Sequence, residues 1–287
     1  MISIVVCSKN ILLYNKLAAN IAETIGVPFE LIRIDNSSKS MGICRAYNQG
    51  AAKSKYEILC FAHEDVRFTT NKWGVHVCNH FKNNSVGAIG IAGASYKLSI
   101  PSSWSVAKGY RAAHFIQFYS KRKKRKKRVY EMPGNTARYR VNSLDGVLII
   151  VKKQVWQTYP FDETNITGFH GYDLDFCFAI SLFTSLYVVF DITIEHFSEG
   201  KPDKHWLEAA MLFCRKWERQ LPACVPGTVV PHSKALRIYK EAVGLFYKRL
   251  NKFGYSRFQV VMKMRRYGIW KEDQAKSLNY LRKLLGR

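Results

Sequence analysis

Short apolar runs alternate with segments of helical periodicity at the start of the chain, and this alternation constrains the fold more than any other feature of the sequence. Three runs predict buried strands, and two segments with apolar residues at helical spacing predict helices. In chain order these segments are 2–7, 11–25, 29–34, 42–52 and 56–61. Such alternation is typical of a parallel sheet with crossover helices. The predicted class is α/β, with ligands at the carboxyl edge of the sheet.

Polar residues follow two of these predicted strands. The run 58–62 stops abruptly in His63, Glu64 and Asp65, which can hold a metal ion or a proton. Asp35 ends the second strand, where a carboxylate can accept hydrogen bonds from a ribose or a base. An Asx turn or helix cap also explains Asp35 and is favoured on position alone, and an acidic strand end is typical of a solvated turn.

The phosphate-binding fingerprints of common nucleotide sites are missing. Neither GxGxxG nor GxxxxGK[ST] occurs in the sequence. A divalent cation is therefore the expected partner for phosphates. Asp145 and Gly146 interrupt the apolar stretch 141–151, where a buried carboxylate needs a partner and a glycine allows close approach to the backbone.

Two carboxylates and a histidine follow later in the chain. Asp173 and Asp175 fall in the first turn of a predicted helix, where the helix dipole favours carboxylates whatever their function. Residues two apart on a helix are separated by about 200°, so one can face a site while the other pairs structurally. His196 follows a predicted strand at 186–194; a lone histidine there is a capable metal ligand but is more often structural.

The positive charge is local. The formal net charge is +24, and 20 of these charges come from the eight-residue basic run 121–128 and from residues 231–287, which carry 15 Lys and Arg against three Asp and Glu. Nucleic acid, an anionic membrane or phosphorylated substrates could explain it. The basic run lies within 93–142, a stretch without clear periodicity, and is either a solvated hairpin tip or an anion-binding lid.

The expected compartment follows from the cysteines and from the apolar segments. Seven scattered cysteines without a CxxC pair indicate buried thiols in a reducing compartment. The amino terminus predicts a strand and not a signal peptide, and the longest apolar stretch, 176–190, is too short to span a bilayer. We expect a cytoplasmic protein.

Seven short motifs occur along the chain in an order that resembles an inverting GT-A glycosyltransferase of the family-two type. The residues that carry the resemblance are Asp35-Asn36-Ser37-Ser38, Asn48-Gln49-Gly50, His63-Glu64-Asp65-Val66, Asp145-Gly146, Phe161-Asp162-Glu163, Gly171-Tyr172-Asp173-Leu174-Asp175, and His196 with the later Lys216-Trp217. The resemblance covers about residues 1–220. It implies a GT-A fold with a mixed, mainly parallel sheet flanked by helices.

The resemblance also implies roles for individual residues. Asp173 would be the general base, and Asp65, with His63 and His196, would bind Mn²⁺ or Mg²⁺. The donor, a UDP-, GDP- or dTDP-sugar, would be held by Asp35, with Ser8, Asn36, Asn48, Glu64 and Asp145 beside it. The acceptor side would include Tyr172, Asp175 and Trp206. Two residues depart from the family pattern: His63 replaces the usual Asp or Asn, and Tyr172 replaces an acidic residue.

The expected organisation follows from these segments. Residues 1–220 would form the GT-A domain, with a nucleotide-sugar half at about 1–95, a basic loop at 95–140 and an acceptor half at about 140–220. Residues 221–287 would form a basic helical appendage, with helices at 233–250, 255–266 and 271–285. These basic, aromatic helices favour peripheral attachment to an anionic inner membrane face, as expected for lipid-linked acceptors in cell-surface polysaccharide synthesis. They could also pair two chains in a homodimer.

Two other functions fit parts of the sequence. A GT-A-like module that binds glycan without catalysis would explain the departures at His63 and Tyr172. A nucleic-acid-binding protein would explain the charge, but the sequence has no helix-turn-helix, zinc-finger or RNP signature. We therefore expect no nucleic-acid partner.

Overall fold

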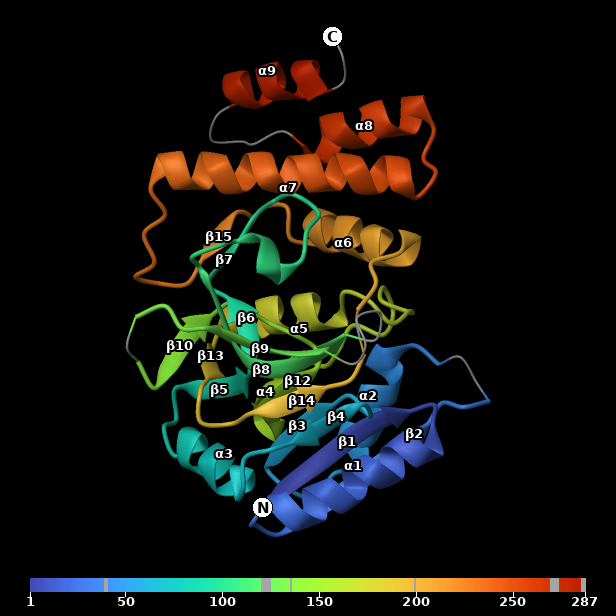
Figure 1. Ribbon diagram of the computed structural model, residues 1–287, viewed down its shortest axis with the longest axis vertical. Helices are drawn as coiled ribbons and strands as arrows, with labels where there is room; N and C mark the ends of the chain where they lie inside the picture. The colour runs from blue at the N-terminus through green and yellow to red at the C-terminus, as the bar shows by residue number, and fades with distance from the viewer. Residues whose placement is uncertain (39–40, 120–124, 135, 199, 269–273, 285–287) are drawn as a thin grey trace.

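The computed structural model describes residues 1–38, 41–119, 125–134, 136–198, 200–268 and 274–284. Within these ranges a central sheet with helices on both faces lies next to a second, smaller sheet (Figure 1). The C-terminal helices form a separate layer at the end of the molecule opposite the first strand.

The central sheet of the described chain has seven strands in the order β10-β13-β5-β12-β3-β1-β2. Their bounds are β1 (Ile2–Ser8), β2 (Phe29–Asp35), β3 (Ile58–Ala62), β5 (Val86–Gly90), β10 (Arg138–Val141), β12 (Leu148–Lys152) and β13 (Ser185–Val189). Strands β1, β2 and β3 are parallel, β12 runs antiparallel between β3 and β5, and β13 is parallel to β5. This mixed, mainly parallel sheet confirms the predicted α/β class.

Helices cover both faces of this sheet. Their bounds are α1 (Ile11–Thr24), α2 (Ile43–Lys53), α3 (Trp73–Phe81), α4 (Lys153–Thr158) and α5 (Tyr172–Ser181). Apolar residues of α2, α4 and α5 share one core with the sheet, and those of α1 and α3 share another. Because β1, β2 and β3 are parallel, their carboxyl ends lie at one edge. The strands and helices predicted between positions 2 and 61 are confirmed as β1, α1, β2, α2 and β3, with only small shifts at their ends.

The second sheet joins distant parts of the chain at that edge. Its order is β11-β6-β8-β14-β4, with β9 paired to β8. Its strands are β4 (Val66–Phe68), β6 (Ala92–Ala94), β8 (Arg111–Tyr119), β9 (Arg125–Glu131), β11 (Ser143–Leu144) and β14 (Ile194–His196). His196 of β14 lies opposite Val66 on one side and Gln117 on the other. This pairing carries His196 to the strand that directly follows Asp65.

Three sequence-based expectations for strands were wrong or incomplete. The stretch 93–142 is not without structure, because β8 and β9 pair antiparallel within it. Residues 125–128 of the basic run belong to β9, and residues 121–124 lie outside the described ranges. The stretch predicted at 141–151 is broken at Asp145, and the one at 186–194 divides into β13 and β14, because the chain there passes from one sheet to the other.

The C-terminal helices have their own core. The helices predicted at 233–250, 255–266 and 271–285 are confirmed within the described residues as the last three of them, and residues 271–273 and 285 lie outside the described ranges. The helices are α6 (Lys204–Lys216), α7 (His232–Lys252), α8 (Arg257–Tyr267) and α9 (Gln274–Leu284). Their buried residues pack with the segment 96–110, which contains β7 (Tyr96–Lys97) and the 3₁₀ turn η1 (Trp104–Val106). Strand β15 (Ala223–Cys224) pairs with β7. The domain boundary near residue 220 stays a prediction. None of the described helices is long and apolar enough to cross a bilayer.

Candidate functional site

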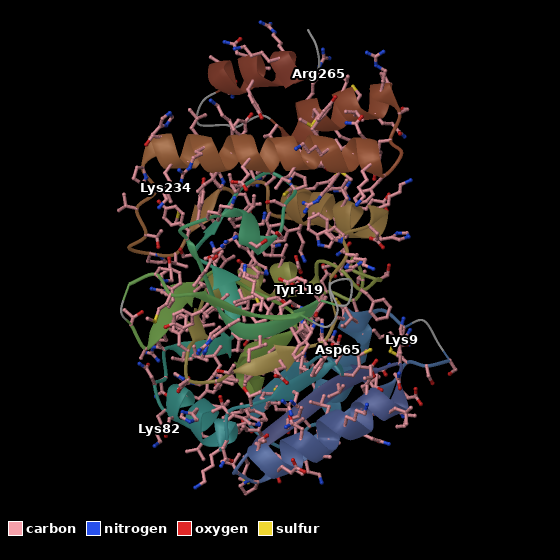
Figure 2. The ribbon with its side chains drawn as sticks, in the orientation of Figure 1. Lys9, Asp65, Lys82, Tyr119, Lys234 and Arg265 are labelled. Atoms are coloured by element: carbon pink, nitrogen blue, oxygen red, sulfur yellow. The ribbon has the colours of Figure 1, made fainter. Side chains whose placement is uncertain are left out.

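The candidate site begins where β3 ends. The strand is buried, and the backbone N–H of His63 donates to the carbonyl of Val147 at 3.2 Å, which fixes the first residue after the strand. The carbonyl of Asp65 accepts from the N–H of Phe197 at 3.0 Å. These backbone hydrogen bonds hold Asp65 beside the end of β14. Asp65 is labelled in Figure 2.

The three residues predicted to bind metal lie together. His63 Nδ1 is 3.9 Å and His196 Nε2 is 3.7 Å from the same oxygen, Asp65 Oδ1, and one ligand atom from each residue lies within 4.8 Å of the others. Both distances are too long for a hydrogen bond. Two ligands at about 2.1 Å from one ion are at most about 4.2 Å apart, so the gap can accommodate a divalent cation.

The protonation of His63 suits a metal ligand. Its burial lowers the pKa of the imidazole, and the carboxylate of Asp65 opposes this shift only in part. His196 lowers the pKa of His63 further, because two imidazolium ions side by side would repel each other. The neutral imidazole, which is the form that coordinates a metal, is therefore favoured.

A cavity of about 260 Å³ opens beside this cluster, on the side of β1. His63, Glu64 and Asp65 line it together with Lys9 and Phe169. The ammonium group of Lys9 lies 4.2 Å from the centre of the Phe169 ring. Glu64 accepts hydrogen bonds from the backbone N–H groups of Lys9, at 3.3 Å, and of Asn10, at 3.1 Å, and thereby fixes this loop. Lys9 was missed in the sequence, where its position just after the first strand was the only signal.

A second cavity of about 260 Å³ lies on the other side of His63. It is lined by His63, Asp145, Tyr172, Asp173 and Trp206, among others. His63 thus forms a wall that both cavities share. The structure therefore brings the predicted metal residues, the predicted base and part of the predicted acceptor side to one continuous region.

Asp173 is held between a backbone N–H and a second carboxylate. Its Oδ2 accepts from the N–H of Gly146 at 3.2 Å. Burial, reinforced by the negative charge of Asp145, raises the pKa of Asp173 to about 7. A carboxyl group that titrates near neutral pH can both take up and release a proton under physiological conditions.

The Asp145-Gly146 turn allows a side chain to approach its backbone closely, as the sequence suggested. A side chain at Gly146 would collide with the hydroxyl of Tyr172. Asp145 Oδ2 accepts from the indole N–H of Trp104 at 2.8 Å, and its Oδ1 accepts from the N–H of Val147 at 3.0 Å. Trp104 was not foreseen, because the stretch around it shows no periodicity. Together with Trp206 it lines a smaller cavity of about 110 Å³ beside Asp173.

Asp175 faces away from these cavities. Its buried carboxylate accepts from Lys216 Nζ at 2.8 Å and from the indole N–H of Trp217 at 2.8 Å. Lys216 also pairs with Asp162 at 2.6 Å. The two-residue spacing on α5 therefore places Asp173 at the cavity and Asp175 in a contact between α5 and α6, and the contacts of Asp175 are structural.

Four residues predicted on the donor side make hydrogen bonds within the fold, away from the cavities beside His63. Asp35 is exposed and accepts from the N–H of Ser37 at 3.0 Å in an Asx turn, and the side chain and then the backbone N–H of Ser37 lower the pKa of this carboxylate. Ser8 Oγ accepts from Arg33, and the amide of Asn36 exchanges two hydrogen bonds of 2.8 Å with the backbone of Met41. Asn48 bonds to Phe161, Trp156 and Glu163. None of the four lines the cavities beside His63.

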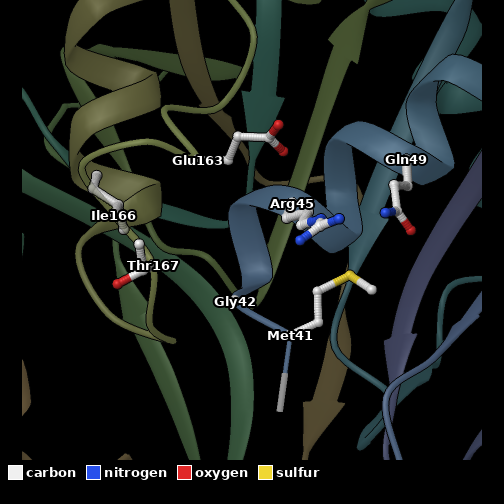
Figure 3. Close-up of a pocket in the computed structure, with 7 residues that line it drawn as sticks. All are labelled: Met41, Gly42, Arg45, Gln49, Glu163, Ile166 and Thr167. Carbon is white, nitrogen blue, oxygen red and sulfur yellow. The ribbon is translucent and has the colours of Figure 1, made fainter. Parts of the chain in front are cut away.

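A larger cavity, of about 640 Å³, lies elsewhere. Figure 3 shows Arg45 and Gln49 of α2 across from Glu163, Ile166 and Thr167. No residue of the His63, Asp65 and His196 cluster lines it, nor does Asp173. The cavity with the larger volume is therefore not the one at the candidate reaction centre.

Comparison with known proteins gives one family match. The model of the Glycosyltransferase like family matches residues 3–220. No curated protein matches the chain. Among solved structures, the chain is similar to GalNAc-T7 with UDP, GalNAc and Mn²⁺, at a TM-score of 0.49 and 12% identity, covering 100% of this chain and 57% of that one. It is also similar to the mannosyltransferase PcManGT from Pyrobaculum calidifontis in complex with GDP-Man and Mn²⁺, at 0.49 and 10%, covering 99% and 85%.

Proposed function

The chain belongs to the Glycosyltransferase like family and has its GT-A α/β fold, and on this premise we propose that it moves a sugar from a nucleoside-diphosphate donor to a glycan or a lipid-linked acceptor. The proposal includes inversion at the anomeric carbon and a role in cell-surface polysaccharide synthesis. The observation that carries it is that the side chain of His63 borders two cavities. The candidate cation site and Lys9 lie at one of these cavities, and Asp173 lies at the other.

The donor would occupy the cavity beside β1. His63, Asp65 and His196 offer two imidazole nitrogens and a carboxylate, a donor set that fits Mn²⁺ and, less well, Mg²⁺. When bound, such an ion neutralises the charge of the leaving nucleoside diphosphate. The ammonium group of Lys9 lines the same cavity and can pair with a phosphate oxygen.

The acceptor would occupy the cavity beside α5. Asp173 would take the proton of the acceptor hydroxyl as its oxygen attacks the anomeric carbon, and the hydrogen bond from Gly146 holds the carboxylate in place. The indole of Trp206 offers an apolar face to a sugar ring. The guanidinium of Arg249 lies 4.4 Å from the centre of this indole ring, so α7 supports the acceptor side from behind.

A thermal-shift screen tests the donor. We expect one class of UDP-, GDP- or dTDP-sugar to raise Tm by roughly 5 °C at about 100 times its Kd, and only with Mn²⁺ present, because the ion and the diphosphate bind together. The matched controls are the free sugar with Mn²⁺ and the nucleotide sugar with a chelator.

Three results would decide among the candidate functions. A panel in which no donor shifts Tm would contradict the transferase. A donor that binds but is neither hydrolysed nor transferred would favour the glycan-binding module, and salt-dependent binding of an oligonucleotide would favour a nucleic-acid protein.

The C-terminal helices would hold the protein to an anionic membrane. On α8, Phe258 is 75% and Met262 is 49% exposed, one turn apart, and the exposed cations Arg257 and Arg265 flank them. Exposed apolar side chains among cations are typical of helices that lie in a membrane interface. Figure 2 shows Arg265 at the end of the molecule opposite Lys82.

Co-sedimentation with vesicles that contain phosphatidylserine tests this attachment. Replacing Arg257 and Arg265 by glutamine should weaken the partition coefficient roughly 30-fold, since each cation contributes about 1 kcal/mol at such a surface. A variant with the exposed Lys53 and Lys82 replaced by glutamine loses the same charge at the ends of α2 and α3 and should bind like the wild type. Equal losses in both variants would indicate a nonspecific effect of net charge and contradict this face as the docking surface.

A further inference from the structure

We propose that Tyr172 and Gln117 are positioning residues that fix the tautomers of His63 and His196, so that in each ring the nitrogen without a proton faces Asp65. This inference rests on the proposed metal-assisted function. The resulting site has two imidazole ligands and one carboxylate, and it would bind a divalent transition-metal ion in preference to Mg²⁺. Tyr172 and His63, the two departures from the family pattern, then act together, one as a metal ligand and the other as the residue that orients it.

The hydroxyl of Tyr172 determines the tautomer of His63. This buried hydroxyl donates to the carbonyl oxygen of Gly146 at 3.0 Å, and a phenol has only one proton to give. It also lies 3.0 Å from Nε2 of His63, so there it must accept, and Nε2 carries the ring proton. His63 Nδ1 is therefore unprotonated, and this is the atom that faces Asp65 Oδ1 at 3.9 Å.

The amide of Gln117 determines the tautomer of His196 in the same way. Its NH₂ group donates to the carbonyl oxygens of His196, at 3.2 Å, and Ser198, at 2.8 Å, which can only accept. The amide oxygen therefore faces Nδ1 of His196, at 3.0 Å, and must accept from it. His196 then carries its ring proton on Nδ1, and its Nε2, 3.7 Å from Asp65 Oδ1, accepts from the hydroxyl of Ser198 at 3.3 Å.

The orientation of both rings distinguishes this cluster from an ordinary pair of surface histidines. Each outer nitrogen has a hydrogen bond of 3.0 Å, whereas each inner nitrogen lies 3.7 to 3.9 Å from a carboxylate oxygen, beyond hydrogen-bond distance. The inner nitrogen of His196 also lies 3.3 Å from the hydroxyl of Ser198. The lone pairs of the two inner nitrogens and the carboxylate converge on one region, where a cation would relieve their repulsion; at His196 the cation would take the place of the long hydrogen bond from Ser198. Partners that fix a ligating imidazole in this way typically change metal affinity by about 10- to 100-fold when they are removed.

The ligand set predicts which ions bind. Mg²⁺ prefers oxygen ligands and a regular octahedron, whereas imidazole suits transition-metal ions. Two nitrogens in a set of three protein ligands should therefore discriminate against Mg²⁺, which an all-carboxylate site would accept. Mn²⁺ is the practical probe because it is paramagnetic and resembles Mg²⁺ in charge and geometry.

Electron paramagnetic resonance of Mn²⁺ with the full-length protein, without any nucleotide, tests the proposal. In the wild type we expect spin-echo modulation from two ¹⁴N imidazole ligands, and displacement of Mn²⁺ by Mg²⁺ only at an excess on the order of 100-fold. Tyr172→Phe and Gln117→Leu should each weaken Mn²⁺ binding about 10- to 100-fold and reduce the modulation from one imidazole.

Matched controls separate positioning from general damage. Tyr139→Phe removes a hydroxyl that forms a hydrogen bond with Ser95 at 2.8 Å. Gln49→Leu removes an amide that lines the cavity of about 640 Å³, away from the candidate metal site. Both should bind Mn²⁺ like the wild type, with circular dichroism checking the fold of all four variants. Should Tyr172→Phe not fold, Gln117→Leu alone decides.

The outcomes distinguish this inference from the proposed function. A modulation from one imidazole or none, displacement by equimolar Mg²⁺, or unchanged Mn²⁺ affinity in the folded variants would overturn the inference, even if nucleotide sugars bind. The expected Mn²⁺ behaviour, with no nucleotide sugar bound or hydrolysed, would support the inference and contradict the transferase.

Discussion

Asp173→Asn should lower the rate of sugar transfer by about 10²- to 10⁴-fold, the usual contribution of a general base, while donor binding is retained. Asparagine keeps the shape of the side chain and can still accept from the N–H of Gly146, but it cannot take a proton. The measurement is kcat with saturating donor and acceptor, together with the donor Kd by calorimetry. Asp191→Asn, at a carboxylate that pairs with His76 and His80, is the matched control.

The same variant tests the raised pKa of Asp173. Activity of the wild type should rise with pH through about 7, as Asp173 loses its proton.

Because folding raises this pKa above its unfolded value, the charged carboxylate destabilises the fold, and stability is lost as pH rises from about 4 to 7. Asp173→Asn should therefore have a higher Tm than the wild type at pH 8, and the difference should vanish near pH 4. Unchanged kcat would remove the base assignment.

Asp65→Ala should weaken Mn²⁺ binding by more than about 10²-fold, since it removes a ligand itself and not only a residue that orients one. Asp65 supplies the only carboxylate in the described His63, Asp65 and His196 cluster. Calorimetry of Mn²⁺ with and without the nucleotide sugar measures the loss, and the donor affinity should fall with it.

The cluster of His76, His80 and Asp191 provides the control for this experiment. Its imidazole nitrogens lie at hydrogen-bond distance from Asp191, 2.9 to 3.1 Å, so it offers the same residue types without the spacing of a metal site. Asp191→Ala should leave the donor-linked Mn²⁺ response unchanged. A response that survives Asp65→Ala but not Asp191→Ala would place the ion at the wrong cluster and contradict the role of Asp65.

The sequence was informative where periodicity and chain order both reflect the fold. Parallel strands must end at one edge, so the end of 58–62 correctly located His63 and Asp65. Helical geometry separated Asp173 from Asp175, although only the structure could show that Asp173 is the one at the cavity.

Other parts of the site could not be predicted, for physical reasons. Gln117 lies on a strand whose pairing with β14 depends on contacts between residues far apart in the chain, and no local pattern encodes them. Asp35 and Asn36 have the composition of a ligand site and of a turn, and here their hydrogen bonds are those of a turn. The type of a polar residue shows that it can form hydrogen bonds but does not specify the group to which it bonds.

The imidazole of His63 borders both cavities, and this has a thermodynamic consequence. A cation that pins one edge of the ring also fixes the surface that an incoming acceptor meets on the other side. Linkage then requires reciprocity: whatever factor the cation applies to acceptor affinity, the acceptor must apply to cation affinity. Substrate occupancy on one side of a single aromatic ring would thus be communicated to the other without any movement of the backbone.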